Sequence, residues 1–370
     1  MIMAADKQDK VLNVPTLRFP EFTEEWNYTE LHELAPGISS GRDKPTNGSI
    51  ALYGSTGQMG MTDKASYTNE IVLVARVGAN AGTMQIVNEP CGVTDNALVV
   101  NAGLWNKYIF YYLQKCNLNR LIFGSGQPLI TGGMLKKIKI RFGSEAERAK
   151  IIKFLILIDE RISTQIKIIE DLKQLRLALI ELLYSQSQPN YKIGDMIVQV
   201  SNRNRNEKKY PVLSVNNRLG FIEQSEQFED RMVASDDTSN YKVVNYNDFA
   251  YNPARINVGS IARLTSFEKG IVSPMYICFN AKRQLLPEYL ECFFDTQYFY
   301  HEMQKRLEGS VRLCLSWEGI CNIPITIPTI ERQKDVSKQI SVIVGKISIE
   351  EQYLKMLESQ KKYILSQMFI

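Results

Sequence analysis

The chain has 370 residues, a formal net charge of +4, 44% hydrophobic and 23% charged residues. This length allows two domains that each bury a core, and the composition is typical of a globular protein. No apolar run reaches the roughly 18 residues of a membrane-spanning helix, and Met1–Lys10 lacks the apolar centre of a signal peptide, so we expect a cytoplasmic protein.

The remaining composition bounds the kinds of site that can be present. With a charge of only +4, any contact with nucleic acid must come from local clusters of basic residues. The six cysteines form no Cys-x-x-Cys pair and there are two histidines, which argues against a zinc site and predicts no bound metal.

The first part of the chain, Leu12 to Phe142, reads as a mixed, strand-rich region. Glu70–Ala75 and Asn96–Val100 are strand-like runs with glycine-rich turns around them, and Trp105–Leu118 is a probable helix.

A long helix is predicted next, over residues 144–186. Ser144 is a suitable N-cap, and Glu147 three residues later completes a capping box. Apolar residues then recur close to the helical period from Ile151 to Leu183, with no glycine or proline before Pro189.

The same order follows a second time. Tyr191 to Pro328 contains strand-like runs and a probable helix, and Thr329 then caps a second long helix over 329–370. The runs in question are Gly194–Val200, Lys242–Tyr246 and Met275–Phe279, and the helix is Pro287–Arg306. Each long helix would measure about 60 Å, and two such apolar stripes in one chain are expected to pair. An ordinary helix pair in a globular core is the alternative.

The sequence repeats itself when it is moved along itself by half its length. Ile138 then meets Ile323, and Leu172 meets Leu357, while a slightly smaller shift brings Arg76 onto Arg255. We interpret this as a duplication, with chance matches of apolar residues as the alternative.

The ends of the two regions carry a resemblance. Each has a Gly-Ser turn, then a Leu/Ile-x-x-Ile-x-Ile strand, at Leu135–Ile140 and at Ile320–Ile325, then a Ser- or Thr-capped helix. Together with the opening Pro15–Phe22 and Trp26, this order resembles the specificity subunits of type I restriction–modification systems over nearly the whole chain.

The resemblance implies an α+β fold in which two similar target-recognition domains are separated by two long antiparallel, coiled-coil-like helices, with an internal two-fold repeat. The implied domains are 1–143 and 187–328, and the implied spacer helices are 144–186 and 329–370.

The resemblance also implies a function without catalysis by this chain. Each domain would read one half of a bipartite site in double-stranded DNA, and the helices would dock two methyltransferase subunits that carry S-adenosylmethionine. Motor-nuclease restriction subunits can join such a complex, and this chain itself would bind no cofactor. The apolar residues that we expect on the docking helices are Leu155, Ile162, Ile169, Leu172, Ile340, Ile347, Leu354 and Leu357.

Polar and basic residues in loop-like segments are the candidates for DNA contact, because such side chains bind phosphates and base edges. In the first domain they are Arg42, Lys44, Tyr53, Ser55, Gln58, Arg76, Asn80, Gln127 and Thr131. In the second they are Arg203, Arg205, Lys208, Lys209, Asn216, Asn217, Arg218, Arg255, Asn257, Arg312 and Ser316. Each can equally be part of a solvated loop, and Arg76 and Arg255 can pair with buried carboxylates instead.

Two other functions stay open. A stand-alone methyltransferase or nuclease is disfavoured, because Asn252-Pro253-Ala254-Arg255 lacks the second proline and the aromatic residue of an adenine-methyltransferase motif. A coiled-coil scaffold without DNA binding would have the same helices and would not bind duplex DNA, even beside its partners.

Overall fold

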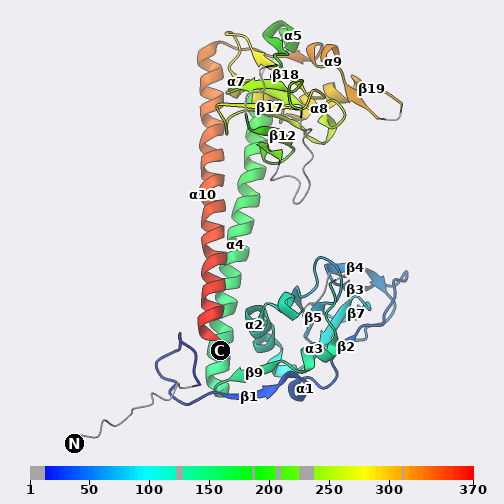
Figure 1. The fold of residues 1–370 in the computed structure, drawn as a ribbon, viewed down its shortest axis with the longest axis vertical. Coiled ribbons are helices and arrows are strands. Elements are labelled where there is room, and N and C mark those ends of the chain that lie inside the picture. The colour runs from blue at the N-terminus through cyan, green and yellow to red at the C-terminus, as the bar shows by residue number, and fades with distance from the viewer. Residues whose placement is uncertain (1–12, 122–127, 186–187, 206–209, 225–236, 311) are drawn as a thin grey trace, which may run out of the picture. The chain divides into compact units, whose positions relative to one another are not determined.

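The computed structural model describes residues 13–121, 128–185, 188–205, 210–224, 237–310 and 312–370. The chain divides into two compact units. Unit 1 comprises Met1–Ile166 and Gln352–Ile370, and unit 2 comprises Lys167–Glu351. Unit 1 is therefore built from two stretches that are far apart in the sequence (Figure 1).

Unit 1 contains a four-stranded sheet of order β2-β8-β5-β6, a three-stranded sheet of order β4-β3-β7 and the strand pair β1-β9. Its strands are β1 (Asn27–Glu30), β2 (Ser39–Ser40), β3 (Ile50–Gly54), β4 (Gly57–Thr62), β5 (Ile71–Ala75), β6 (Met84–Val87), β7 (Cys91–Val93), β8 (Ala97–Val100) and β9 (Lys139–Phe142). Its short helices are α1 (Leu31–Leu34), η1 (Gly103–Trp105), α2 (Asn106–Cys116), η2 (Leu118–Leu121) and α3 (Gly132–Lys136).

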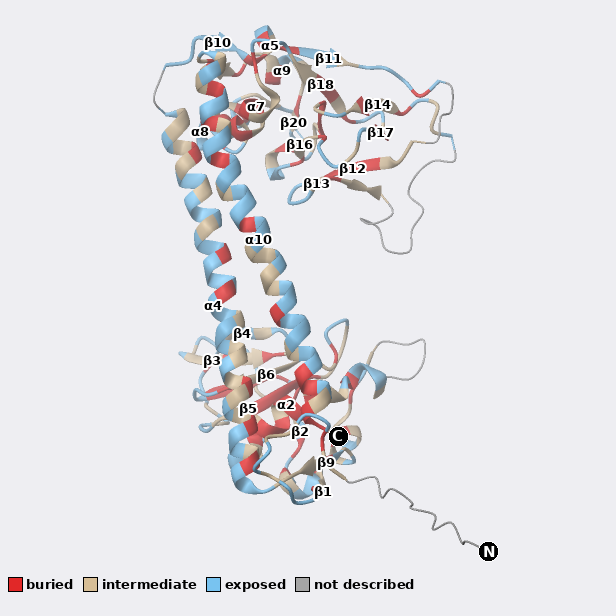
Figure 2. Ribbon diagram, turned by 90° about the vertical axis from the view of Figure 1, so that its left-hand side faces the viewer, coloured by how far each residue is buried: buried red, intermediate tan, exposed pale blue. Residues whose placement is uncertain are grey.

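The core of unit 1 follows from the alternation of side chains along β5. All five residues of this strand are buried, because each of its faces is covered (Figure 2). Val72 and Val74 pack into the cluster that contains α2, while Ile71 and Leu73 pack into the cluster that the three-stranded sheet covers.

Unit 2 repeats this plan with a fourth strand in its second sheet and with an additional strand pair, β19-β20. Its sheets have the orders β11-β18-β15-β16 and β13-β12-β17-β14, beside the pairs β10-β21 and β19-β20. The strands are β10 (Tyr191–Lys192), β11 (Ile197–Val200), β12 (Val212–Asn216), β13 (Gly220–Glu223), β14 (Lys242–Asn245), β15 (Phe249–Tyr251), β16 (Ile261–Arg263), β17 (Lys269–Val272), β18 (Ile277–Ala281), β19 (Leu307–Glu308), β20 (Cys314–Leu315) and β21 (Pro324–Ile325). The helices are α5 (Ile193–Met196), η3 (Ile256–Val258), α7 (Pro287–Phe293), α8 (Gln297–Gln304) and α9 (Trp317–Cys321).

The strands of the two units correspond in chain order, in sheet order and in direction. In both, the strand pair β3–β7 or β12–β17 is parallel and the hairpin β3–β4 or β12–β13 is antiparallel. In both, alternate residues of the central strand separate two clusters, as Phe249 and Ala250 do in β15.

The two long helices are α4 (Glu145–Tyr184) and α10 (Ile330–Met368), with 40 and 39 residues. Within unit 1, Asp159 of α4 pairs with Lys361 of α10 at 2.6 Å, and the cores of both helices meet α2. Within unit 2, Lys173 pairs with Glu351 at 2.7 Å. Arg161 of α4 also contacts Tyr353 of α10 in unit 1, and in unit 2 Ile180 packs in one cluster with Val336 and Ile340. In each unit the paired stretches therefore run antiparallel. Because each unit includes part of both helices, it is larger than the recognition domain expected from the sequence, and the boundaries of those domains remain a prediction.

The structure corrects several predicted elements. The strands predicted at Leu135–Ile140 and Ile320–Ile325 begin inside helices α3 and α9, so only Lys139–Phe142 and Pro324–Ile325 are strands there. The strand predicted from Met275 begins at Ile277. Gly194–Met196 belongs to the helical turn α5, and only the following residues form a strand. The helix predicted over Pro287–Arg306 is two helices, because the Thr296 hydroxyl accepts a hydrogen bond from Phe299 N at 3.0 Å and caps a new helix.

The capping box predicted at the start of α4 is half present. The Ser144 hydroxyl accepts from the backbone N–H of Glu147 at 3.2 Å. The Glu147 carboxylate instead accepts from Arg18 Nε and Nη2, at 2.7 and 2.8 Å, and from Trp26 Nε1, at 3.1 Å. Across the described ranges, none of the helices has the length and apolar character needed to cross a membrane.

Candidate nucleic-acid interface

The first group of predicted residues follows β2 in unit 1. Asp43 accepts hydrogen bonds from Val93 N at 2.8 Å and from Ser66 Oγ at 2.7 Å, so its side chain is tied to the body of the unit. Arg42 and Lys44 on either side of it are exposed. Alternate residues of an extended segment point in opposite directions, so the inward aspartate holds the two basic residues outward. We call Arg42-Asp43-Lys44 the first basic triplet.

A second group of the same kind follows β11 in unit 2. Asn204 is buried and its backbone N–H donates to Tyr241 O at 2.9 Å. Its neighbours Arg203 and Arg205 are exposed, and Arg203 donates to Asn240 Oδ1 at 3.0 Å. We call Arg203-Asn204-Arg205 the second basic triplet.

Strand register makes the two triplets equivalent. In unit 1, Ser39 of β2 pairs with Val99 of β8. In unit 2, Val200 of β11 pairs with Cys278 of β18, and β8 and β18 occupy the same place beside β5 and β15. Each triplet begins three residues after the paired position, so both units present two basic side chains at the same point of the fold. The sequence comparison did not show this equivalence.

The β3–β4 hairpin of unit 1 carries three further candidates. The Tyr53 hydroxyl donates to Glu89, and this hydrogen bond, with burial, raises the pKa of Tyr53 to about 12. Ser55 lies half-buried in the turn, and the exposed Gln58 amide donates to Gly60 O at 3.4 Å. Gln58 thus keeps the freedom to contact a base, whereas Tyr53 is held in place.

The corresponding β12–β13 hairpin in unit 2 has an ordered tip. Asn216 Oδ1 accepts from Arg218 N at 2.8 Å and from Leu219 N at 3.1 Å, and Gly220 has φ +69°. The Asn216 side chain therefore shapes the turn, while Asn217 and Arg218 remain exposed.

Arg76 and Arg255 are not equivalent, contrary to the sequence comparison. The carbonyl of Arg76 accepts from Ile130 N at 2.9 Å, and in unit 2 the carbonyl of Pro253 accepts from Leu315 N at 3.0 Å. The register of β15 thus places Pro253 where Arg76 lies, two residues before Arg255.

The surroundings of these two arginines also differ. Arg76 Nη1 donates to Asp95 O at 3.5 Å, a long contact to a carbonyl that leaves the charge without a carboxylate partner among the described residues. Arg255 lines a cavity of about 330 Å³ together with Ser214, Asn252 and other polar side chains.

The remaining residues predicted to contact DNA differ in exposure and in structural role. Thr131 and Ser316 cap short helices, since their hydroxyls accept from Met134 N and Gly319 N, so they have equivalent structural roles. Asn80 and Arg312 are exposed and Asn257 is half-buried. Gln127, Lys208 and Lys209 lie outside the described residues.

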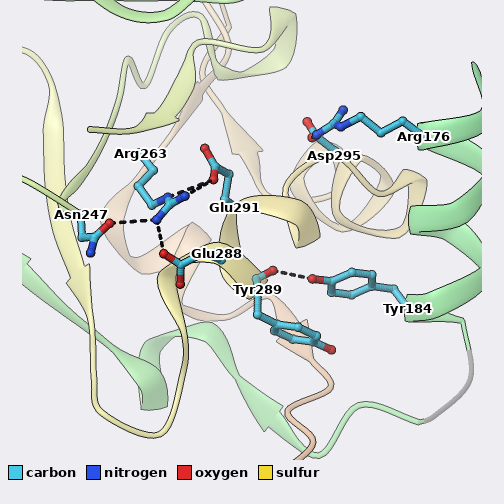
Figure 3. Close-up of polar contacts among 8 residues, drawn as sticks. All are labelled: Arg176, Tyr184, Asn247, Arg263, Glu288, Tyr289, Glu291 and Asp295. Atoms are coloured by element: carbon cyan, nitrogen blue, oxygen red, sulfur yellow. Dashed lines mark hydrogen bonds and ion pairs between the residues drawn. The ribbon is translucent and has the colours of Figure 1, made fainter. Parts of the chain in front are cut away.

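One basic residue near the predicted set is occupied by the fold. Arg263 of β16 donates to Glu288 and Glu291 of α7 and to Asn247, as Figure 3 shows. Its side chain is 11% exposed, so its charge is used inside the unit and is not free for a phosphate.

The side chains predicted to dock a partner on the long helices are buried or half-buried within this chain. Leu155, Ile169, Ile340, Ile347 and Leu357 are buried, and Ile162, Leu172 and Leu354 are half-buried. Side chains that a partner could reach are instead exposed apolar residues of both helices, among them Leu157, Leu175, Leu182, Val342, Ile349, Met356 and Tyr363. Within the described ranges, no group of His, Cys, Asp and Glu side chains is arranged to hold a metal ion.

Comparison with known proteins points in one direction. Residues 11–174 match the family model of the type I restriction modification DNA specificity domain. No curated protein sequence matches the chain. The S subunit of a type I restriction-modification system from M. genitalium has a TM-score of 0.56 at 17% identity, covering 96% of this chain and 99% of that chain.

A chain from a structure on complex assembly and conformational transition of the type I R-M system has a TM-score of 0.56 at 12% identity, with coverage of 94% and 98%. At these identities the likeness concerns the fold. Residues 11–174 are therefore similar to the type I restriction modification DNA specificity domain, and the chain has the fold of a type I specificity subunit along nearly its whole length.

Proposed function

We propose that the chain is the sequence-specific DNA-binding subunit of a type I restriction–modification complex and reads a bipartite site. The observation that carries this proposal is the equivalence of the two basic triplets. Two units with the same strand order that present basic pairs at the same point are suited to two half-sites of one duplex.

We also propose a division of labour between this chain and its partner subunits. We infer that it does no chemistry and that methyltransferase subunits dock on the exposed apolar side chains of α4 and α10. Those subunits would bind S-adenosylmethionine and flip the target adenine into their own pocket. Restriction subunits could join the same complex, which we place in the cytoplasm.

Salt dependence tests the triplets. Each phosphate contact contributes about 0.9 to the slope of log K against log salt concentration. In the complex with methyltransferase subunits, Arg42→Ala with Lys44→Ala should lower that slope by about 2, as should Arg203→Ala with Arg205→Ala. The measurement is fluorescence anisotropy of a labelled duplex between low and moderate salt.

The matched control removes two exposed charges beside the start of β11, the end opposite the second triplet, by Lys282→Ala with Arg283→Ala, and should keep the slope. Equal slopes for the unaltered chain, both triplet variants and the control would show that the triplets do not contact DNA phosphates. Failure of the unaltered complex to bind any duplex would favour a scaffold without DNA binding.

The spacer role of the helices has its own test. One heptad inserted after Ile169 and another after Glu351 adds about 10 Å to each helix, or about three base pairs at 3.4 Å each. We expect the sequences of the half-sites to stay the same while their separation grows, measured by sequencing methylated DNA. Half-sites that change at constant separation would contradict the spacer role.

A further inference from the structure

Two exposed apolar side chains lie on adjoining turns of unit 2. Leu219 at the tip of the β12–β13 hairpin is 72% exposed, and Val258 in η3 is 52% exposed. The turns meet, because a Cβ added to Gly259 would lie 3.5 Å from the Cβ of Asn217. The hydroxyl of Ser260 also donates to the carbonyl of Val215 at 3.2 Å.

This tip is ordered by its own hydrogen bonds. Asn216 Oδ1 holds the backbone N–H groups of Arg218 and Leu219, and Gly220 takes the left-handed conformation that a side chain would strain. A single exposed leucine is ordinary on a protein surface. A leucine fixed on a turn and flanked by polar side chains is different, because it can enter a groove without first losing backbone freedom.

The side chains of the two turns include hydrogen-bonding and apolar groups but no carboxylate. We call Asn217, Arg218, Leu219, Asn257 and Val258 the tip surface. It offers amides, one guanidinium and aliphatic groups. Neither 216–220 nor 255–261 contains a carboxylate, which is the side-chain group suited to accept from the N4 amine of cytosine.

The amides and aliphatic groups of the tip surface match an A·T pair, whereas the Arg218 guanidinium is suited to a phosphate or to the guanine of a neighbouring pair. In the major groove an A·T pair shows the N7 acceptor and N6 donor of adenine, to which an asparagine amide can bind in bidentate fashion, and the C5 methyl group of thymine, which makes apolar contacts. We propose that the tip surface reads an A·T pair in the half-site of unit 2, with Leu219 packed against the thymine methyl group. This inference rests on the proposed function and adds the base pair and the residue that determines specificity.

Uracil substitution tests the contact, because deoxyuridine differs from thymidine only by that methyl group. The bound site is first obtained by selecting random duplexes with the complex of the full chain and methyltransferase subunits. Each thymine of the site is then replaced singly by uracil. At one position we expect affinity to fall about fourfold, the effect of burying one methyl group.

Variants assign that position to Leu219. Leu219→Ala should bind the thymine and uracil duplexes equally, whereas Leu219→Met, which keeps an apolar contact, should retain most of the discrimination. Leu104→Ala is the control, because Leu104 is a highly exposed leucine in η1 of unit 1 and its removal should leave discrimination unchanged. The exposure of Leu219 makes its truncation harmless to folding.

The outcomes separate the two proposals. If no duplex sequence is selected, the proposed function fails. If a bipartite site is selected but tolerates uracil throughout, or if Leu219→Ala discriminates as well as the unaltered chain, the function stands and the reading by Leu219 is overturned.

Discussion

The Glu147 side chain accepts more hydrogen bonds than the predicted capping box would give it. It stands in the first turn of α4 with a side chain only 1% exposed, and three N–H groups of Arg18 and Trp26 converge on it. The bidentate contact with Glu147 raises the pKa of the Arg18 guanidinium, which stays charged. The segment before β1 is therefore anchored to the long helix through one carboxylate.

We expect Glu147→Ala to lower the free energy of unfolding of unit 1 by about 3–5 kcal/mol, because it leaves the Arg18 charge unpaired in a largely buried place. Urea denaturation followed by tryptophan fluorescence measures the loss. Glu145→Ala, on the same turn with an exposed side chain, should change it by less than about 0.5 kcal/mol. Equal losses for both variants would mean that the contact stabilises little.

At the scale of elements, α7 is joined to its sheet by charge and to α4 by polar contacts. Glu288 and Glu291 of α7 hold Arg263 of β16 (Figure 3). Arg176 of α4 pairs with Asp295 just beyond α7, and Tyr184 donates to the carbonyl of Tyr289. These contacts fix the short helix, whose seven residues are too few to be stable alone.

Removal of that arginine has a pH-dependent effect. Arg263→Ala should lower the free energy of unfolding at pH 7 by about 2 kcal/mol, because Glu291 loses its charged partner. Burial already raises the pKa of Glu291 above its ordinary 4.5, and loss of Arg263 removes an opposing influence. The folded variant therefore holds a proton more tightly than the unfolded chain, so its stability rises as pH falls from 7 toward 4.5.

Chemical denaturation at pH 7 and pH 5 checks this sign. The deficit of the variant relative to the unaltered chain should be smaller at pH 5, whereas Arg283→Ala, an exposed change in the same unit, should show none at either pH. A deficit that grows on acidification would show that Glu291 is not the group left unpaired.

The elements differ in how well the sequence predicts them. The apolar period from Ile151 to Leu183 is local, so it located α4 within a few residues. The register between β2 and β8 depends on hydrogen bonds between distant segments and on loop lengths that differ between the units. Sequence matching therefore paired Arg76 with Arg255 and missed the equivalence of the basic triplets. The break before α8 was missed as well, because it needs no glycine or proline.

At the scale of the whole molecule, unit 1 depends on both ends of the described chain. Phe369, 2% exposed, packs against the rings of Tyr108 and Tyr112, and the Tyr112 hydroxyl donates to Ile370 O at 2.8 Å. Leu17 N also donates to Gln367 O at 3.0 Å. Unit 2, in contrast, is one continuous stretch.

A fragment of residues 1–166 should therefore be unstable, since it lacks the apolar side chains that α10 adds to the core. Burial of a single large core side chain is worth about 3–5 kcal/mol, a large share of the stability of a domain. A peptide of residues 352–370 should restore folding, and the same peptide with Phe369→Ala should do so poorly, measured by circular dichroism and protection from protease. A fragment that folds equally well without the peptide would refute this dependence.

The discontinuity of unit 1 has a consequence for synthesis on the ribosome. Domains generally fold as they emerge, but the stretch of unit 1 up to Ile166 must wait for residues 352–370. The continuous stretch of unit 2 is made before residues 352–370, so the earlier-made sheet of unit 1 stays without its closing helix until those residues have followed. A product that stops before residue 352 would thus lack a stable unit 1, although most of that unit had already been made.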